Sequence, residues 1–178
     1  MTDAIQELRV RAEILHGRIE AGDACAVLRL RVLPQYRRSK EDDLAEIAQK
    51  IRRQDCLTIM AAELGFPNWP EANRVLTGED NDVDFGTLLC PKKCCGHLNR
   101  WYKHYDDAAA MRETCDGYLL AYRRQYLVVD RYYIESLGLD PDDSDWEALG
   151  FDWVRPRNIG ARARLYAKLV AALPREAA

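Results

Sequence analysis

The amino-acid sequence predicts a mainly α fold, with an N-terminal helical bundle followed by a mixed half that contains a short strand pair. Through most of the first 78 residues, apolar residues recur at steps of three and four, as on one face of a helix. Capping residues and glycines stand at the expected ends of these segments. The segment YLLAYRRQYLVV at residues 118–129 is instead rich in aromatic and β-branched residues, which is typical of strands.

The predicted bundle covers residues 1–78. Its first helix spans residues 3–20, where apolar residues form one stripe and Gly22 follows as a left-handed end. Asp23 begins a shorter segment that Pro34 ends, because proline cannot continue a helix. Three further helices are expected around the apolar faces Leu44–Ile51, Leu57–Leu64 and Trp69–Leu76.

The acidic, turn-like stretch at residues 79–84 marks the expected boundary with the second half, residues 85–178. We expect the two halves to pack together as one compact unit. The second half is predicted to contain a short strand, a cysteine-rich loop, a helix, the strand pair and three more helices. The expected ranges are 85–89 for the strand, 99–115 for the helix, and 130–137, 144–150 and 160–173 for the last three helices.

With 48% hydrophobic and 31% charged residues, the 178-residue chain has the composition of a soluble globular protein. The formal net charge is −3, whereas nucleic-acid binders usually carry a basic excess, so a nucleic-acid partner is not expected. The N-terminal segment has no apolar run for a signal peptide, and no stretch approaches the ~20 apolar residues of a membrane span. We therefore expect a cytoplasmic protein with reduced thiols and no membrane partner.

The densest supply of soft metal ligands lies in residues 85–117, which contain four of the six cysteines and two of the three histidines. Zinc takes about four such ligands at ~2.0–2.3 Å. One straight helix separates its residues by about 1.5 Å each along the axis, so the ligands would have to come from the loop. The candidate zinc site consists of Cys90, Cys94 or Cys95, and His97, with a fourth ligand from elsewhere.

Other roles for the same cysteines stay open. The spacing C-x3-C-C-x-H differs from the paired C-x2-C of zinc ribbons, so thiols that only pack as small apolar groups are the competing interpretation. The adjacent Cys94 and Cys95 are consistent with a redox disulfide, and Cys90-Pro91 matches a short dipeptide associated with regulatory haem binding. Cys115 is expected on the buried face of its helix, where it would be unreactive.

Two charged segments are interpreted as structural. The stretch DPDDSD at residues 140–145 resembles a calcium loop but lacks the glycine and the glutamate that such a loop needs. We expect a turn and a helix start there. Several arginines and Lys168 form a basic C-terminal stretch, in which Arg162 and Arg164 are expected on a solvated helix face.

Residues 57–76, LTIMAAELGFPNWPEANRVL, resemble the short helical hairpin with an LGF-x-x-W signature found near the N-terminus of some bacterial glyoxalase-superfamily and ankyrin-type proteins. The repeated strand–helix units of a glyoxalase fold do not follow, so the resemblance implies no activity. The second half, with GYLLAYRRQYLVVD and SLGLDPDDSDW, is similar to uncharacterised proteobacterial proteins, which implies a bacterial source.

The expected function is that of a non-catalytic cytosolic binding or regulatory protein, with a protein or small ligand as partner and a Cys/His zinc site. One alternative is a DNA-binding regulator that uses residues 57–76 as a helix-turn-helix, since Ala61 and Gly65 match the turn of that motif. Glu71 in the first turn of the second helix would face phosphate with the wrong charge. The other alternative is a thiol-dependent enzyme with Cys90 or Cys95 paired to His97.

Overall fold

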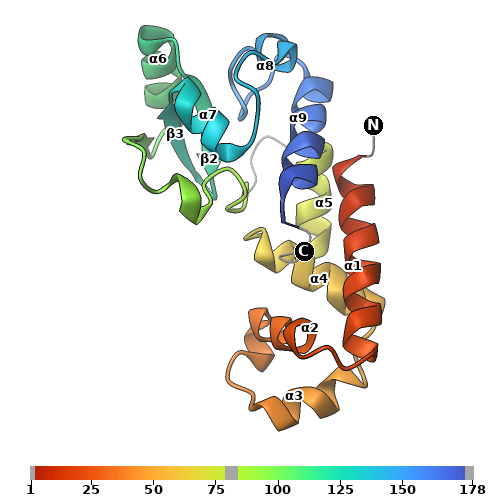
Figure 1. Ribbon diagram of the computed structural model, residues 1–178. Coiled ribbons are helices and arrows are strands. Elements are labelled where there is room, and N and C mark those ends of the chain that lie inside the picture. The colour runs from red at the N-terminus through yellow and green to blue at the C-terminus, as the bar shows by residue number, and fades with distance from the viewer. Residues whose placement is uncertain (1–2, 79–83, 175–178) are drawn as a thin grey trace.

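The computed structural model describes residues 3–78 and 84–174, and within them it confirms the predicted mainly α fold with a short strand pair. Figure 1 shows the N-terminal helices as an upright group, with α2 and α3 at its lower end and the small sheet to one side at the top. The N-terminal helices are α1 (Ala4–Glu20), α2 (Ala24–Leu28), α3 (Glu41–Ala48), α4 (Arg53–Glu63) and α5 (Trp69–Thr77). Two 3-10 turns, η1 (Arg29–Val32) and η2 (Pro34–Tyr36), connect α2 to α3.

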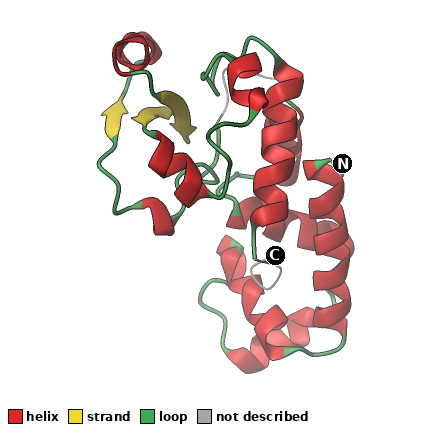
Figure 2. Cartoon of the chain, turned by 45° about the horizontal axis from the view of Figure 1, so that its top comes forward, coloured by secondary structure: helices red, strands yellow, loops and turns green. Residues whose placement is uncertain are grey.

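The second half contains a three-stranded antiparallel sheet in the order β1-β3-β2. Its elements are η3 (Lys92–Cys94), β1 (Arg100–Tyr102), α6 (Tyr105–Cys115), β2 (Tyr118–Tyr122), β3 (Gln125–Val129), α7 (Arg131–Leu137), α8 (Ser144–Leu149) and α9 (Ile159–Ala172). In Figure 2 the three strands lie together on one side of the molecule, apart from the N-terminal helices.

Two local predictions for the second half are wrong. The helix expected at residues 99–115 is divided into β1 and α6, because Trp101 pairs with Leu127 of β3 and extends the sheet. The strand expected at residues 85–89 does not form. Gly86 has a left-handed φ of 66°, and its carbonyl accepts a hydrogen bond from Arg123 N at 2.8 Å in the β2–β3 turn.

The buried apolar residues form two clusters. The smaller cluster fills the lower end of the N-terminal helices and includes Leu15, Leu44 and Ile59. The larger cluster takes residues from both sides of the expected boundary at residues 79–84, among them Leu8 of α1 and Trp146 of α8. The larger core therefore joins the two halves of the chain.

Helix α9 makes this shared core possible, because it returns to pack against α1, α5 and α8. Arg162 of α9 is 0% exposed, so its expected place on a solvated face is wrong. Its Nη1 donates hydrogen bonds to Trp153 O at 2.9 Å and Val154 O at 3.4 Å. The Arg162 guanidinium also lies close to Gly78, the C-cap of α5: a Cβ built on Gly78 would be 3.6 Å from Arg162 Nη2. The positive charge of Arg162 is therefore near the C-terminal, negative end of the α5 dipole.

Burial lowers the pKa of the Arg162 guanidinium, but arginine keeps its charge near neutral pH. We predict that Arg162→Met lowers the free energy of unfolding by about 2–4 kcal/mol, because two buried carbonyls lose their donor. Urea denaturation of the variant and of the exposed control Arg124→Met measures the difference. The control is expected to stay within about 0.5 kcal/mol of the wild type. Equal stability of Arg162→Met and the wild type would contradict this role.

Candidate functional site

The cysteine-rich loop is held in place by backbone turns and by α7. Cys90 N donates to Thr87 O at 3.0 Å, and Cys94 N donates to Pro91 O at 2.9 Å within η3. Lys93 Nζ donates to Leu137 O at 3.1 Å, where a lysine stabilises the last carbonyls of α7. The loop is therefore fixed by its own backbone and by the end of a helix.

Tyr133 of α7 is the buried centre of this region. Its hydroxyl donates to Leu89 O at 2.8 Å, and the His97 ring meets its ring edge-on with centroids 5.4 Å apart. Burial, together with the neighbouring Cys90 thiol, raises the pKa of Tyr133 above its ordinary value. The hydroxyl therefore stays protonated and acts as a structural donor.

The predicted zinc ligands do not come together in the described part of the chain. No three His, Cys, Asp or Glu side chains among residues 3–78 and 84–174 form a group that could hold a metal ion. Cys94 is fully buried and Cys95 is exposed. His97 Nε2 lies 2.9 Å from the Ser136 hydroxyl, so that nitrogen already has a partner. The donor set does not fit tetrahedral zinc, and zinc binding stays a prediction that this arrangement does not support.

The buried thiols have the properties of packing groups. Burial raises the pKa of the Cys94 thiol, and it raises the pKa of the Cys56 thiol to about 11. A protonated thiol is a poor nucleophile, so these two cysteines are not activated. The expectation that Cys115 is buried is wrong, because it lies exposed at the end of α6.

Cys90 lies instead on a cleft of about 580 Å³ between the two halves of the chain. The cleft is bounded by the end of α4, the loop at residues 87–93, the end of α7 and the end of α9. Its walls are mainly apolar and include Leu64, Leu88, Leu137 and Leu169. The cleft residues on α4, α7 and α9 were not predicted as a site, because only tertiary packing brings these helix ends together.

The charged side chains that line this cleft differ in whether they already bond another group of the protein. Glu63 is bound by Arg29, with Nε at 2.8 Å from Oε1 and Nη2 at 2.6 Å from Oε2, although burial still raises the pKa of its carboxyl. Lys93 is engaged at Leu137 O. Lys92 is exposed on the lining of the cleft, so its ammonium group can meet an anion. The sequence shows two adjacent lysines after Cys90-Pro91, but two lysines in a row do not by themselves indicate a binding site.

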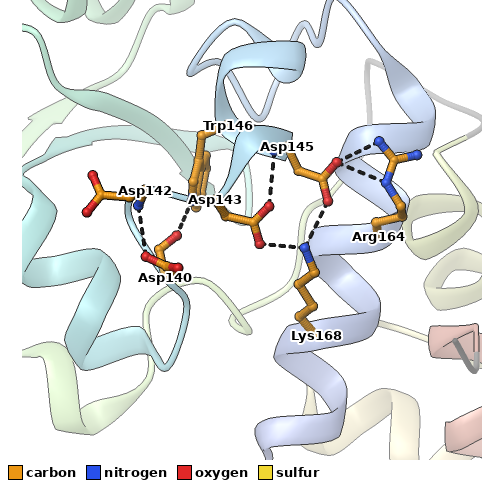
Figure 3. A network of polar contacts seen from close by, with 7 residues as sticks. All are labelled: Asp140, Asp142, Asp143, Asp145, Trp146, Arg164 and Lys168. Atoms are coloured by element: carbon orange, nitrogen blue, oxygen red, sulfur yellow. Dashed lines mark hydrogen bonds and ion pairs between the residues drawn. The ribbon is translucent and has the colours of Figure 1, made fainter.

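The acidic loop at residues 140–145 forms a network of structural contacts, which Figure 3 shows. The side chain of Asp143 caps α8, and Asp140 O accepts a hydrogen bond from Trp146 Nε1 at 2.9 Å. Asp145, 6% exposed, accepts hydrogen bonds from Arg164 Nη2 at 2.6 Å and from Lys168 Nζ at 2.9 Å. Lys168 also bonds Asp143. The acids of this loop therefore tie α8 to α9.

The α4–α5 hairpin is packed mainly into the core. Trp69 is partly buried against the larger cluster, as a structural anchor would be. Glu71 and Arg74 face each other with Oε2 and Nη1 3.3 Å apart. This ion pair places an acid beside Arg74 on the surface of the would-be recognition helix, which disfavours contact with phosphate.

Comparison of the chain with protein-family models, curated proteins and solved structures found no match. The resemblances of residues 57–76 and of the second half therefore stay predictions. No helix in the described ranges is long and apolar enough to cross a membrane. The cleft beside Cys90 is the candidate site, on the grounds of its own geometry.

The network around Asp145 predicts a pH dependence of stability. Hydrogen bonding from Arg164, with a further hydrogen bond from Lys168, outweighs the opposing effect of burial and lowers the pKa of Asp145 below its ordinary value. A carboxyl whose pKa is lower in the folded state stabilises the protein above its unfolded pKa, and this contribution is lost as the pH falls through the folded pKa. Asp145→Asn should therefore be less stable than the wild type at neutral pH, with a difference that shrinks below about pH 4.

Urea denaturation at several pH values measures this difference, with the exposed Glu46→Gln as a control that also removes one carboxylate. The control should follow the wild type throughout. If the difference in unfolding free energy between Asp145→Asn and the wild type stayed constant from neutral pH to well below about pH 4, the charge of Asp145 would contribute nothing to stability.

Thiol alkylation provides a second prediction, because the six cysteines differ in exposure. In native protein, iodoacetamide should modify the exposed Cys25, Cys95 and Cys115, whereas Cys56 and Cys94 should react only after unfolding. Peptide mass spectrometry assigns each site. If zinc held the loop, Cys95 would instead be protected until a chelator removed the metal. Protection of Cys95 that a chelator relieves would restore the zinc hypothesis.

Proposed function

We propose that this protein is a non-catalytic cytoplasmic binding or regulatory protein, which binds a small amphipathic anion in the cleft beside Cys90. The observation that carries the proposal is the cleft itself, which combines an apolar wall with an exposed ammonium group. Its volume of about 580 Å³ falls within the ~300–1,000 Å³ of small-molecule sites.

The apolar body of the ligand would lie against the helix ends. Leu64 after the end of α4, Leu137 of α7 and Leu169 of α9 approach from different parts of the chain. Binding an alkyl chain there removes apolar surface from water at about 25 cal/mol per Å². The position of the cleft between the two halves also fits a regulatory role, because a ligand would contact both of them.

We infer that the ligand is an anion because, of the charged groups Glu63 and Lys92 on the cleft, only Glu63 has its charge neutralised by an ion pair within the described residues. The carboxylate of Glu63 is neutralised by Arg29, whereas Lys92 is exposed on the cleft lining. A carboxylate at the end of an alkyl chain would therefore be attracted to Lys92. Because Lys92 is exposed, this contribution is expected to be modest and to weaken with salt.

Binding of decanoate, decanol and decylamine by isothermal titration calorimetry tests the proposal. We expect decanoate to bind more tightly than decanol, and decylamine to bind most weakly. Ala172→Phe, which adds bulk to the cleft lining, should weaken decanoate binding about tenfold or more. The matched control Ala171→Phe changes the neighbouring exposed residue, which does not line the cleft, and should bind as the wild type does.

A second pair of variants isolates the charge. Lys92→Gln should remove the preference for decanoate over decanol, whereas Lys103→Gln, another exposed lysine, should keep it. Decanoate should also slow the alkylation of Cys90 but not that of the exposed Cys115. Equal binding by wild type and Ala172→Phe, with no protection of Cys90, would contradict the proposal.

A further inference from the structure

A second cavity lies among the N-terminal helices, at residues 19–51, far in the sequence from the cysteine-rich loop. It has a volume of about 650 Å³ and is formed by the end of α1, by α2 and by α3. These are the elements at the lower end of the molecule in Figure 1. We refer to this cavity as the α2–α3 groove. It belongs to the region of the smaller core cluster and shares no lining residue with the cleft beside Cys90.

Four of the twelve described residues that line the α2–α3 groove are glycine or alanine. Gly22, Ala24, Ala45 and Ala48 all line it, and short side chains allow another backbone to approach closely. Leu44 and Ile51 add buried apolar side chains to the lining. Leu28, on the same lining, is 38% exposed although it is a large apolar residue. The groove therefore has apolar surface that another apolar chain can cover.

The charge of the groove has one sign. Both charged residues that line it among the described residues, Glu20 and Glu41, are acidic. Helix α3 (Glu41–Ala48) contains four acids and no lysine or arginine, although Lys40 and Lys50 lie just outside its ends. Glu20 lies 3.5 Å from His16, and most of its side chain is exposed. A basic partner would match this surface.

The secondary structure of the groove selects the form of that partner. Its walls are helices, whose interior backbone groups are already paired, so they offer no strand edge to an extended peptide. An amphipathic helix needs only apolar contact along one face and charge along its sides. We infer that the α2–α3 groove binds an amphipathic helix of a partner protein, with its apolar face against Val27 and Leu28 and its Lys or Arg side chains beside Glu20 and Glu41.

Three synthetic helical peptides of about 16 residues test this inference by fluorescence anisotropy. The first has leucines at helical spacing and lysines elsewhere, the second replaces the lysines with glutamates, and the third keeps the lysines but replaces the leucines with serines. The groove should bind the first peptide and neither of the others. Binding of the serine peptide as tightly as the leucine peptide would show charge attraction alone and would overturn the inference.

Matched variants of the full chain locate the binding. Ala45→Phe fills the groove from an exposed position of α3 and should weaken binding about tenfold or more, whereas Ala110→Phe on the exposed side of α6 should have no effect. The pair Glu20→Gln and Glu41→Gln should weaken binding at low salt, whereas Glu13→Gln with Glu113→Gln, which removes the same charge elsewhere, should not.

Two results would overturn the inference. One is unchanged binding of the leucine–lysine peptide by Ala45→Phe. The other is a dimer of the wild-type chain in sedimentation equilibrium that Ala45→Phe dissociates, because the groove would then hold a second copy of the chain. The test is independent of the cleft, since Ala172→Phe should bind the peptide as the wild type does.

Discussion

The return of α9 onto α1 and α5 is the packing interaction on which the rest of the structure depends. The helix buries Leu165, Leu169 and Val170 in the larger core, and each such side chain contributes about 1.5–3 kcal/mol when fully buried. It also buries the charge of Arg162, which is tolerated because the carbonyls of residues 153 and 154 and the C-terminal end of α5 supply negative partial charge. One helix therefore joins elements from the beginning, middle and end of the chain.

The candidate cleft is a consequence of this arrangement. The last turn of α9 reaches the loop at residues 87–93 and forms one wall, while Asp145 and Asp143 hold the middle of α9 to α8 through Arg164 and Lys168. Arg11 of α1 donates to Leu173 O at 3.3 Å and holds the end of the helix from the other side. The wall is thus fixed along its length, which favours binding because little order must be gained when a ligand arrives.

The four cysteines of residues 85–117 differ in their surroundings. Cys94 packs in the core and Cys90 lies on a cleft wall, while Cys95 and Cys115 are exposed, so the four thiols of the segment lie in three different environments. A zinc site needs its donors within bonding distance of one point, and sequence proximity does not ensure that. The loop is ordered by turns, by Lys93 at the end of α7 and by the Tyr133 hydroxyl on Leu89. These contacts hold the loop in place.

The sequence by itself determined the mainly α class, the strand pair at residues 118–129 and the positions of most helices, because apolar spacing and caps such as Asp23 and Asn68 act within a few residues. It did not determine β1, which exists only because β3 offers Trp101 a partner. The burial of Arg162 and the cleft beside Cys90 were likewise decided by tertiary structure. Each depends on helix ends that are distant in sequence meeting in space, and no local pattern records which ends will meet.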